Sequence, residues 1–277
     1  MNQFLNTPPA LTGHVLNRLG CPIHYWLGGA EERPLIVLMH GATMDHRMFN
    51  AQIAPLLADY RVLVWDARGH GLSQPVGTRF TLELLAQDLL AILDELGVAQ
   101  AVIGGQSMGG YVAQQVYFLA PERVRAMLII GATPLTKAYS RLEVWTLKAT
   151  MPLFGLWPYD HLIKVIGKNT AAEAEVQTYA IEAVQQIRKE DFLTIWRAVT
   201  LAIDHVGRPG FTFAVPLLLL HGDHDRTGTI RRDMPIWAKS EPTAVYQVIP
   251  HAGHNANQDN PMFTNQAILG FLQQTLA

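Results

Sequence analysis

Ser107 stands in a glycine-rich segment, residues 105–110 (GQSMGG), which follows an apolar run and opens a stretch of helical periodicity. A serine hydroxyl is a weak nucleophile unless it is exposed to the substrate and served by a base. A sharp turn from a strand into a helix gives that exposure by forcing a strained backbone. Side chains at positions 105 and 109 would collide across such a turn, whereas glycine fits there. The segment therefore predicts a nucleophilic serine at a strand-to-helix corner.

Two later segments offer an acid and a base for that serine. Residues 221–226 (HGDHDR) follow an apolar run and contain two carboxylates, Asp223 and Asp225. Residues 250–254 (PHAGH) follow another such run and end on His254. An imidazole beside the serine can take its proton, and a carboxylate can orient the imidazole and stabilise its charged form. These residue types therefore suit nucleophilic catalysis by a serine.

The segments around these residues show the pattern of an α/β fold. Short aliphatic and β-branched runs alternate with longer stretches of helical periodicity, which is typical of parallel strands joined by crossover helices. Strands are predicted over 15–19, 23–27, 35–40, 61–66, 101–106, 126–130, 215–220 and 244–249, the first two as an antiparallel edge. Helices are predicted over 48–58, 81–96, 108–119, 230–238 and 262–276. Thr81 is the expected cap of the second helix and Gly97 its terminator.

Between residues 135 and 213 the alternation stops, and helical periodicity broken by Pro152, Pro158 and Pro209 replaces it. This pattern predicts an inserted helical subdomain. Apolar and aromatic residues gather in its first part, where they either pack the insertion onto the sheet or line a substrate pocket. The candidate pocket residues of this segment are Trp145, Met151, Phe154 and Trp157.

The sequence resembles the α/β-hydrolase superfamily from about residue 33 to residue 276. The resemblance is carried by residues 40–43 (HGAT), by residues 66–73 (DARGHGLS), by the serine segment and by the two late segments as a pair. It implies a mostly parallel eight-stranded sheet flanked by helices, with a helical cap inserted after the sixth strand. The core domain would then comprise residues 1–134 and 214–277, and the cap residues 135–213.

The resemblance also implies which residues are catalytic. In this superfamily the nucleophile, the acid and the histidine follow one another along the chain. The family pattern G-x-x-D selects Asp225, with Asp223 as the rival acid, and the glycine-histidine loop selects His254. A triad of Ser107, Asp225 and His254 is the expectation. No cofactor is needed for this chemistry.

Other residues are expected to support the triad. By resemblance, the backbone amides of Ala42 and Met108 hold the oxyanion, with Thr43 replacing Ala42 if the loop register differs. His40 is either a brace for this loop or a substrate-binding residue. The glycine-rich segment 66–73 lacks the spacing of a nucleotide-binding loop. Its Asp66 and Arg68 are therefore expected to brace loops beneath the site.

The expected function is hydrolysis of a carboxylic ester of a small to medium apolar substrate through an acyl-enzyme. A serine nucleophile differs from the aspartate that dehalogenases and epoxide hydrolases of this superfamily use. Lactonases, thioesterases, carbon-carbon bond hydrolases and cofactor-free perhydrolases share the same triad and stay open as alternatives. A ligand-binding receptor on the same scaffold is the alternative outside enzymes.

The histidines and carboxylates between residues 221 and 254 raise one further alternative, a zinc or iron site. Their spacing matches no known motif such as H-E-x-x-H, and a metallohydrolase would leave the serine segment unexplained. No metal is therefore expected.

The composition argues against several other classes of protein. The 277 residues are 49% hydrophobic and 16% charged, and no basic run accompanies the net charge of −2, which argues against nucleic-acid binding. No apolar run approaches the roughly 20 residues that cross a bilayer, and the first twenty residues lack a secretion signal. Cys21 is the single cysteine, which suits a reducing compartment. We expect a cytoplasmic protein with a small-molecule ester-like substrate, and a homodimer is one candidate assembly.

Overall fold

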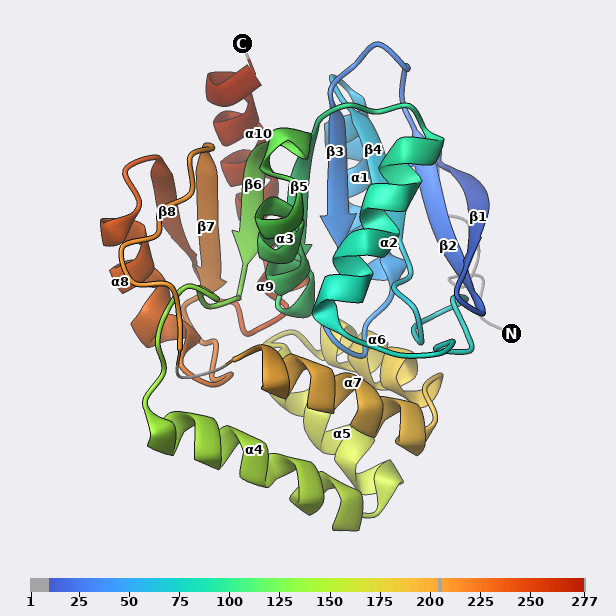
Figure 1. Cartoon of the computed structure of the whole chain (residues 1–277), viewed down its shortest axis with the longest axis vertical. Helices are drawn as coiled ribbons and strands as arrows, with labels where there is room; N and C mark the ends of the chain where they lie inside the picture. Colours follow the sequence, from blue (N-terminus) through green and yellow to red (C-terminus); the bar gives the residue numbers. More distant parts are fainter. Residues whose placement is uncertain (1–9, 204–205, 277) are drawn as a thin grey trace.

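A computed structural model describes residues 10–203 and 206–276, and in these residues eight strands form one central sheet (Figure 1). The sheet order is β1-β2-β4-β3-β5-β6-β7-β8. Strand β2 runs antiparallel to both β1 and β4, and the remaining neighbours are parallel. The strands are β1 (Thr12–Arg18), β2 (Cys21–Gly28), β3 (Leu35–Met39), β4 (Arg61–Trp65), β5 (Ala101–Gln106), β6 (Val124–Ile130), β7 (Leu217–Gly222) and β8 (Ala244–Ile249).

All eight predicted strands are confirmed, although the ends of six of them differ from the predicted bounds by one to three residues. Strand β1 ends at Arg18, one residue before the predicted end, because Leu19 and Gly20 take positive φ values of 47° and 76° and turn the chain into β2. Strand β7 begins at Leu217 rather than at Val215. Pro216 explains this difference, since proline has no N–H to donate to a neighbouring strand.

Helices cover both faces of the sheet. Those on one face are α2 (Leu82–Glu95), α3 (Met108–Leu119) and α8 (Ile230–Ser240), and those on the other are α1 (Asn50–Leu57), α9 (Ala256–Asp259) and α10 (Pro261–Leu276). Thr81 caps α2 as expected, because its side chain accepts a hydrogen bond of 3.0 Å from the Leu84 amide. The predicted helix over 48–58 is divided into a 3-10 turn (His46–Phe49) and α1. The short helix α9 was absent from the sequence prediction.

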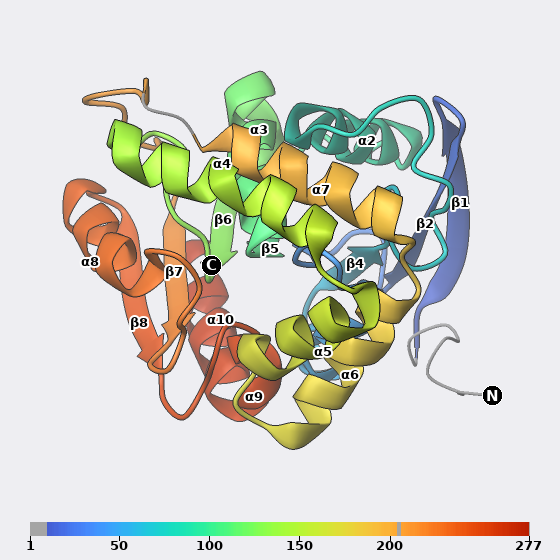
Figure 2. The same ribbon diagram turned by 90° about the horizontal axis from the view of Figure 1, so that it is seen from below.

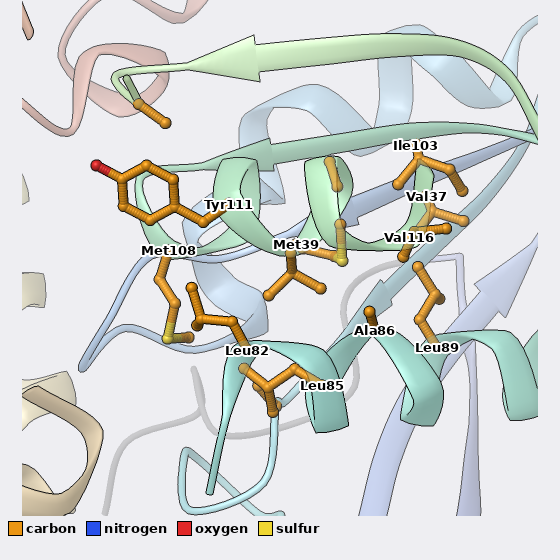
Figure 3. Close-up of a cluster of buried hydrophobic side chains, with 14 of the residues drawn as sticks. Val37, Met39, Leu82, Leu85, Ala86, Leu89, Ile103, Met108, Tyr111 and Val116 are labelled. Atoms are coloured by element: carbon orange, nitrogen blue, oxygen red, sulfur yellow. The ribbon is translucent and has the colours of Figure 1, made fainter. Parts of the chain in front are cut away.

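Side chains of the central strands alternate between the two helical layers. Val37 and Met39 of β3 pack on the side of α2 and α3, whereas Ile36 and Leu38 pack on the side of α1 and α10. Figure 3 shows the first of these layers, in which Met108 at the start of α3 lies beside Leu82 of α2. The carboxyl end of β5 is therefore held between two apolar layers, which fixes the position of the residues that follow it.

Helices α4 (Arg141–Leu156), α5 (Tyr159–Thr170), α6 (Ala174–Gln185) and α7 (Lys189–Ala202) connect β6 to β7. They lie across the carboxyl ends of the parallel strands (Figures 1 and 2). Pro158 precedes α5, as predicted, but Pro152 lies inside α4 and does not end it. A capping box between Ser140 and Glu143 stabilises the start of α4.

Two contacts fasten these helices to loops of the sheet. The Tyr179 hydroxyl of α6 donates at 3.2 Å to the backbone carbonyl of Asp45, which lies in the segment after β3. The Asp45 carboxylate in turn pairs with Arg47 at 2.7 Å. The Asn255 amide donates to the Thr170 carbonyl at the end of α5, at 2.7 Å. Helices α5 and α6 are therefore joined to the segments that follow β3 and β8.

A buried ion pair holds the loop after β4 against α2. Arg68 donates from Nε and Nη2 to the Asp88 carboxylate at 2.7 and 2.8 Å, and from Nη1 to the Val76 carbonyl at 3.0 Å. Neither side chain is exposed to solvent. Arg18 adds a hydrogen bond of 2.9 Å to the same carboxylate.

We predict that Asp88→Ala lowers the free energy of unfolding by about 3–5 kcal/mol, because it leaves the Arg68 guanidinium buried without its counter-charge. Urea unfolding followed by circular dichroism measures this loss. Asp94→Ala is the matched control on the same helix, since the Asp94 side chain is 66% exposed in its pair with Arg123. The control is expected to lose less than about 1 kcal/mol, and an equal loss in both variants would contradict the prediction.

Candidate active site

Ser107 occupies the corner between β5 and α3 that the sequence predicts. Its φ of 49° and ψ of −112° lie outside the regions that ordinary residues favour. The Ser107 amide donates to the Ile130 carbonyl of β6 at 2.8 Å, and its own carbonyl accepts from the Tyr111 amide at 3.1 Å as α3 begins. These two hydrogen bonds hold the half-buried serine in a backbone conformation that would be strained elsewhere.

Glycines allow two other segments to approach this corner. A Cβ built on Gly105 would lie 2.2 Å from the carbonyl carbon of Gly109, so a side chain there would collide across the turn, as predicted. A Cβ built on Gly41 would lie 3.4 Å from the Ser107 Cβ. The loop after β3 therefore passes directly beside the serine.

Asp225 and His254 form a hydrogen-bonded pair at the ends of β7 and β8. The His254 Nδ1 lies 2.9 Å from the Asp225 Oδ2, and both side chains are buried. Burial acts to raise the pKa of the Asp225 carboxyl, but the charge and hydrogen bond of His254, with hydrogen bonds from Thr227, hold that pKa below its ordinary value. An ionised Asp225 accepts the Nδ1–H, which leaves Nε2 as the nitrogen able to take a proton.

The other polar residues near this pair are engaged elsewhere. Asp223 accepts from the Ala252 amide at 3.0 Å and pairs with the His224 Nδ1 at 2.9 Å, so it does not replace Asp225 at the imidazole of His254. The His221 ring bonds to the Gly222 carbonyl and to a tyrosine hydroxyl, each at 2.8 Å. Within residues 10–203 and 206–276, no three His, Cys, Asp or Glu side chains gather so as to hold a metal ion.

Contacts between neighbouring strand ends place the serine and the acid-base pair at one edge of the sheet. Gly131 follows the residue that binds the Ser107 amide, and a Cβ built on it would lie 3.3 Å from His254 Nδ1 and 3.5 Å from Asp225 Oδ2. The His254 carbonyl also accepts a hydrogen bond of 2.9 Å from the Gln106 side chain. All three residues that the sequence proposes as a triad therefore lie at this edge, with the His254–Asp225 pair next to the segment that binds the Ser107 backbone.

His40 has both ring nitrogens engaged with backbone groups. Its Nε2 accepts from the Ala67 amide at 3.0 Å, so its Nδ1 carries the proton and donates to the Gly41 carbonyl at 2.8 Å. Burial lowers the pKa of His40, which agrees with a neutral ring. These bonds are those of a loop brace, the first of the two roles considered for His40.

His70 forms a second, reciprocal link between the same two loops. Its Nε2 accepts from the Thr43 amide at 3.0 Å and its Nδ1 donates to the Arg68 carbonyl at 3.0 Å. The Thr43 amide is therefore committed to His70. Burial, reinforced by the nearby His40, lowers the pKa of His70 to about 3, so the ring is neutral at ordinary pH.

The candidate pocket residues of α4 differ in their surroundings. Trp145 is 66% exposed, and Met151 is half-buried. Phe154 packs against Trp157 and against Trp196 of α7, with ring centroids 6.0 and 5.2 Å apart. Phe154 therefore contributes to the contact between α4 and α7, whereas Trp157, the residue after α4, also packs edge-on against His161 of α5.

The sequence analysis missed the positions of His70 and Gln106. Both lie inside segments that it quoted, 66–73 and 105–110, but their side-chain partners are 27 and 148 residues away along the chain. The signal that could have identified them is residue type, because a neutral imidazole can accept a hydrogen bond from a backbone amide and a glutamine amide can donate one to a backbone carbonyl.

The sequence pattern of the alpha/beta hydrolase family matches residues 36–267, and this chain belongs to that family. A probable esterase of Oryza sativa subsp. japonica is 34% identical over 272 residues, which cover 90% of this chain and 95% of the relative. The 3-oxoadipate enol-lactonase 1 of Acinetobacter baylyi is 34% identical over 132 residues, 48% of this chain and 46% of the relative. The chain spans between 36% and 65% of the length of several curated relatives, this lactonase among them.

A solved hydrolase from Pseudomonas aeruginosa PA01 shares the fold with a TM-score of 0.81 and 25% identity, over 96% of this chain and 99% of that one. In the part of the chain that the structure describes, no helix combines the length and apolar character needed to cross a bilayer. The family match and the shared fold make this chain a member of a hydrolase family.

Because folded His70 is neutral, we expect the free energy of unfolding to depend on pH. An unfolded histidine binds a proton near pH 6.5, whereas folded His70 does so only near pH 3. Between these values the unfolded chain holds more protons, so the free energy of unfolding falls as the pH drops from about 6.5 towards 3. We predict that His70→Gln, which keeps an acceptor but does not titrate, makes this dependence shallower by up to about 1.4 kcal/mol per pH unit.

Urea unfolding between pH 4.5 and 7 measures this difference in slope. His161→Gln, at an exposed position of α5, controls for the loss of a histidine as such. Identical slopes for the wild type and His70→Gln would show that His70 is not held neutral in the folded protein.

Proposed function

We propose that this chain hydrolyses carboxylic esters through an acyl-enzyme on Ser107. His254 Nε2 takes the hydroxyl proton as Ser107 Oγ attacks the carbonyl carbon, and returns it to the leaving alcohol when the tetrahedral intermediate collapses. Water then repeats the sequence on the acyl-enzyme and releases the acid. The hydrogen bond of 2.9 Å between His254 and the ionised Asp225, beside the strained corner at Ser107, is the observation that carries the proposal.

The oxyanion is assigned to the backbone amides of Met108 and Ala42. Met108 is the first residue of α3, where a helical amide has no partner within the helix and the dipole favours negative charge. Ala42 is preferred to Thr43, because the Thr43 amide already donates to His70. The approach of Gly41 to Ser107 supports this placement of the loop.

Residues 135–213 are proposed to form a cap that selects the substrate, and residues 1–134 and 214–277 the core. The position of α4–α7 across the strand ends supports this division, although residues 1–9, 204–205 and 277 lie outside the described part. The half-buried apolar side chains of α4 favour an apolar acyl or alcohol group of small to medium size. No step of the mechanism requires a cofactor.

We predict that Ser107→Ala lowers kcat on a p-nitrophenyl ester by a factor on the order of 10⁶, because the acyl-enzyme can no longer form. Ser240→Ala removes an exposed serine at the end of α8, outside the proposed cap, and is expected to keep kcat, which makes it the matched control. Circular dichroism checks that both variants are folded. Undiminished turnover by Ser107→Ala would refute the proposed nucleophile.

The substrate class is tested by one panel of purified-protein assays. Aryl esters of graded acyl length, lactones, thioesters and a vinylogous diketone are compared by kcat/KM, with Ser107→Ala as the blank. We expect the aryl esters to give the highest values and the acyl length to shift them, since apolar burial contributes about 0.8 kcal/mol per methylene. A maximum for lactones or for the diketone would select one of the alternative hydrolases, and ligand binding without turnover would indicate a receptor.

A further inference from the structure

Gln106 lies where three segments of the candidate site meet. It is the last residue of β5, directly before Ser107, and its side chain is buried. Its Nε2 donates a hydrogen bond of 2.9 Å to the backbone carbonyl of His254. Its Oε1 lies against Gly41, because a Cβ built on that glycine would be 2.1 Å from this oxygen. One amide group thus contacts both the histidine loop and the loop after β3.

The other hydrogen bonds of the histidine loop, residues 250–255, point elsewhere. The Ala252 amide donates to Asp223 at 3.0 Å, which fastens the loop to the end of β7. The Asn255 amide donates to the Thr170 carbonyl at 2.7 Å, which fastens it to the end of α5. The Gly253 amide donates to Asp259 at 2.8 Å and the His254 ring bonds to Asp225 at 2.9 Å. None of these bonds reaches β5, the strand that leads to the serine. The bond from Gln106 does so.

We propose that Gln106 is a positioning residue that holds the imidazole of His254 in register with the Ser107 hydroxyl. The inference rests on the proposed function, in which His254 takes the proton of Ser107. A general base must lie within about 2.6–3.2 Å of the oxygen that it deprotonates, and a displacement of about 1 Å can cost 100-fold in rate. Gln106 directly precedes the nucleophile Ser107, and its side-chain amide binds the backbone carbonyl of the base, His254. It touches no reacting atom.

The contact with Gly41 extends the same role to the oxyanion loop. Any side chain at position 41 would displace the Gln106 amide, because the space that a Cβ would need is occupied by Oε1. The position of the Gln106 amide therefore requires a glycine at position 41. The amide of Gln106 sets the spacing of the loop after β3 and of the histidine loop from one rigid strand.

The test compares two buried glutamines that each donate to a backbone carbonyl. Gln106→Met keeps the length of the side chain and removes the donor. Gln52→Met, the control on α1, removes from an equally buried position a hydrogen bond of 3.1 Å to the Asn257 carbonyl, together with bonds to the Asn265 and Asn257 side chains. For a p-nitrophenyl ester we expect Gln106→Met to lose about 10–100-fold in kcat with KM changed less than about twofold, whereas Gln52→Met keeps kcat. Gln106→Glu, equal in shape but without the amide donor, is the second variant should the methionine variant fail to fold.

A second measurement does not depend on turnover. Hydrogen exchange of the Ala252, Gly253 and Asn255 amides is expected to accelerate in Gln106→Met and not in Gln52→Met. An unchanged kcat, a loss confined to KM, or unchanged exchange in Gln106→Met would each overturn the proposal. A wild-type protein that neither hydrolyses the ester nor reacts with a fluorophosphonate would instead refute the proposed function, and the exchange rates would still decide whether Gln106 positions the histidine loop.

Discussion

The positive φ of Ser107 is the constraint on which the candidate site depends. A non-glycine residue in this region costs about 1–3 kcal/mol and persists only where its surroundings over-determine it. Here the surroundings are the bond from the Ser107 amide to Ile130, the start of α3, and the contact of Gly105 with Gly109. The first requires β6 to lie beside β5 in the sheet, and the other two require a helix that returns across the face of β5. The α/β architecture is therefore the means by which one serine is presented at a corner.

Buried side chains satisfy backbone groups of the two loops near that corner. His40 and His70 each accept one amide and donate to one carbonyl, so two neutral rings join the loop after β3 to the loop after β4. Neutral imidazole suits this role because it offers one donor and one acceptor, whereas a charged ring offers two donors. The burial that depresses the pKa of His70 is thus also what preserves its hydrogen bonds.

Local signals account for the parts of the fold and site that the sequence predicted well. Strands β5 and β8 and helix α3 match their predicted bounds, because the glycine-rich corner separates β5 from α3 and Pro250 follows β8. The predicted start of β7 was wrong, because the apolar run begins at Val215 but Pro216 has no N–H to donate to a neighbouring strand. The partners of Gln106 and His70, and the contact of Phe154 with Trp196, depend on segments distant in sequence. No periodicity reports such contacts, because they form only when the chain has folded.

The attachment of α5 and α6 links the proposed cap to the geometry of the candidate site. Tyr179 bonds to Asp45 just after the loop that passes Ser107, and Thr170 bonds to Asn255, the residue after His254. A change in these helices that accommodates a different substrate would therefore move the loops that carry the proposed oxyanion donor and the proposed base. Helix α4 packs on α7 through aromatic rings and pairs with α8 through Glu143 and Arg232, and neither contact involves the segments after β3 and β8. Under the proposed cap role, substitutions on the face of α4 that contacts α7 would therefore disturb these two segments less than substitutions near Tyr179 or Thr170.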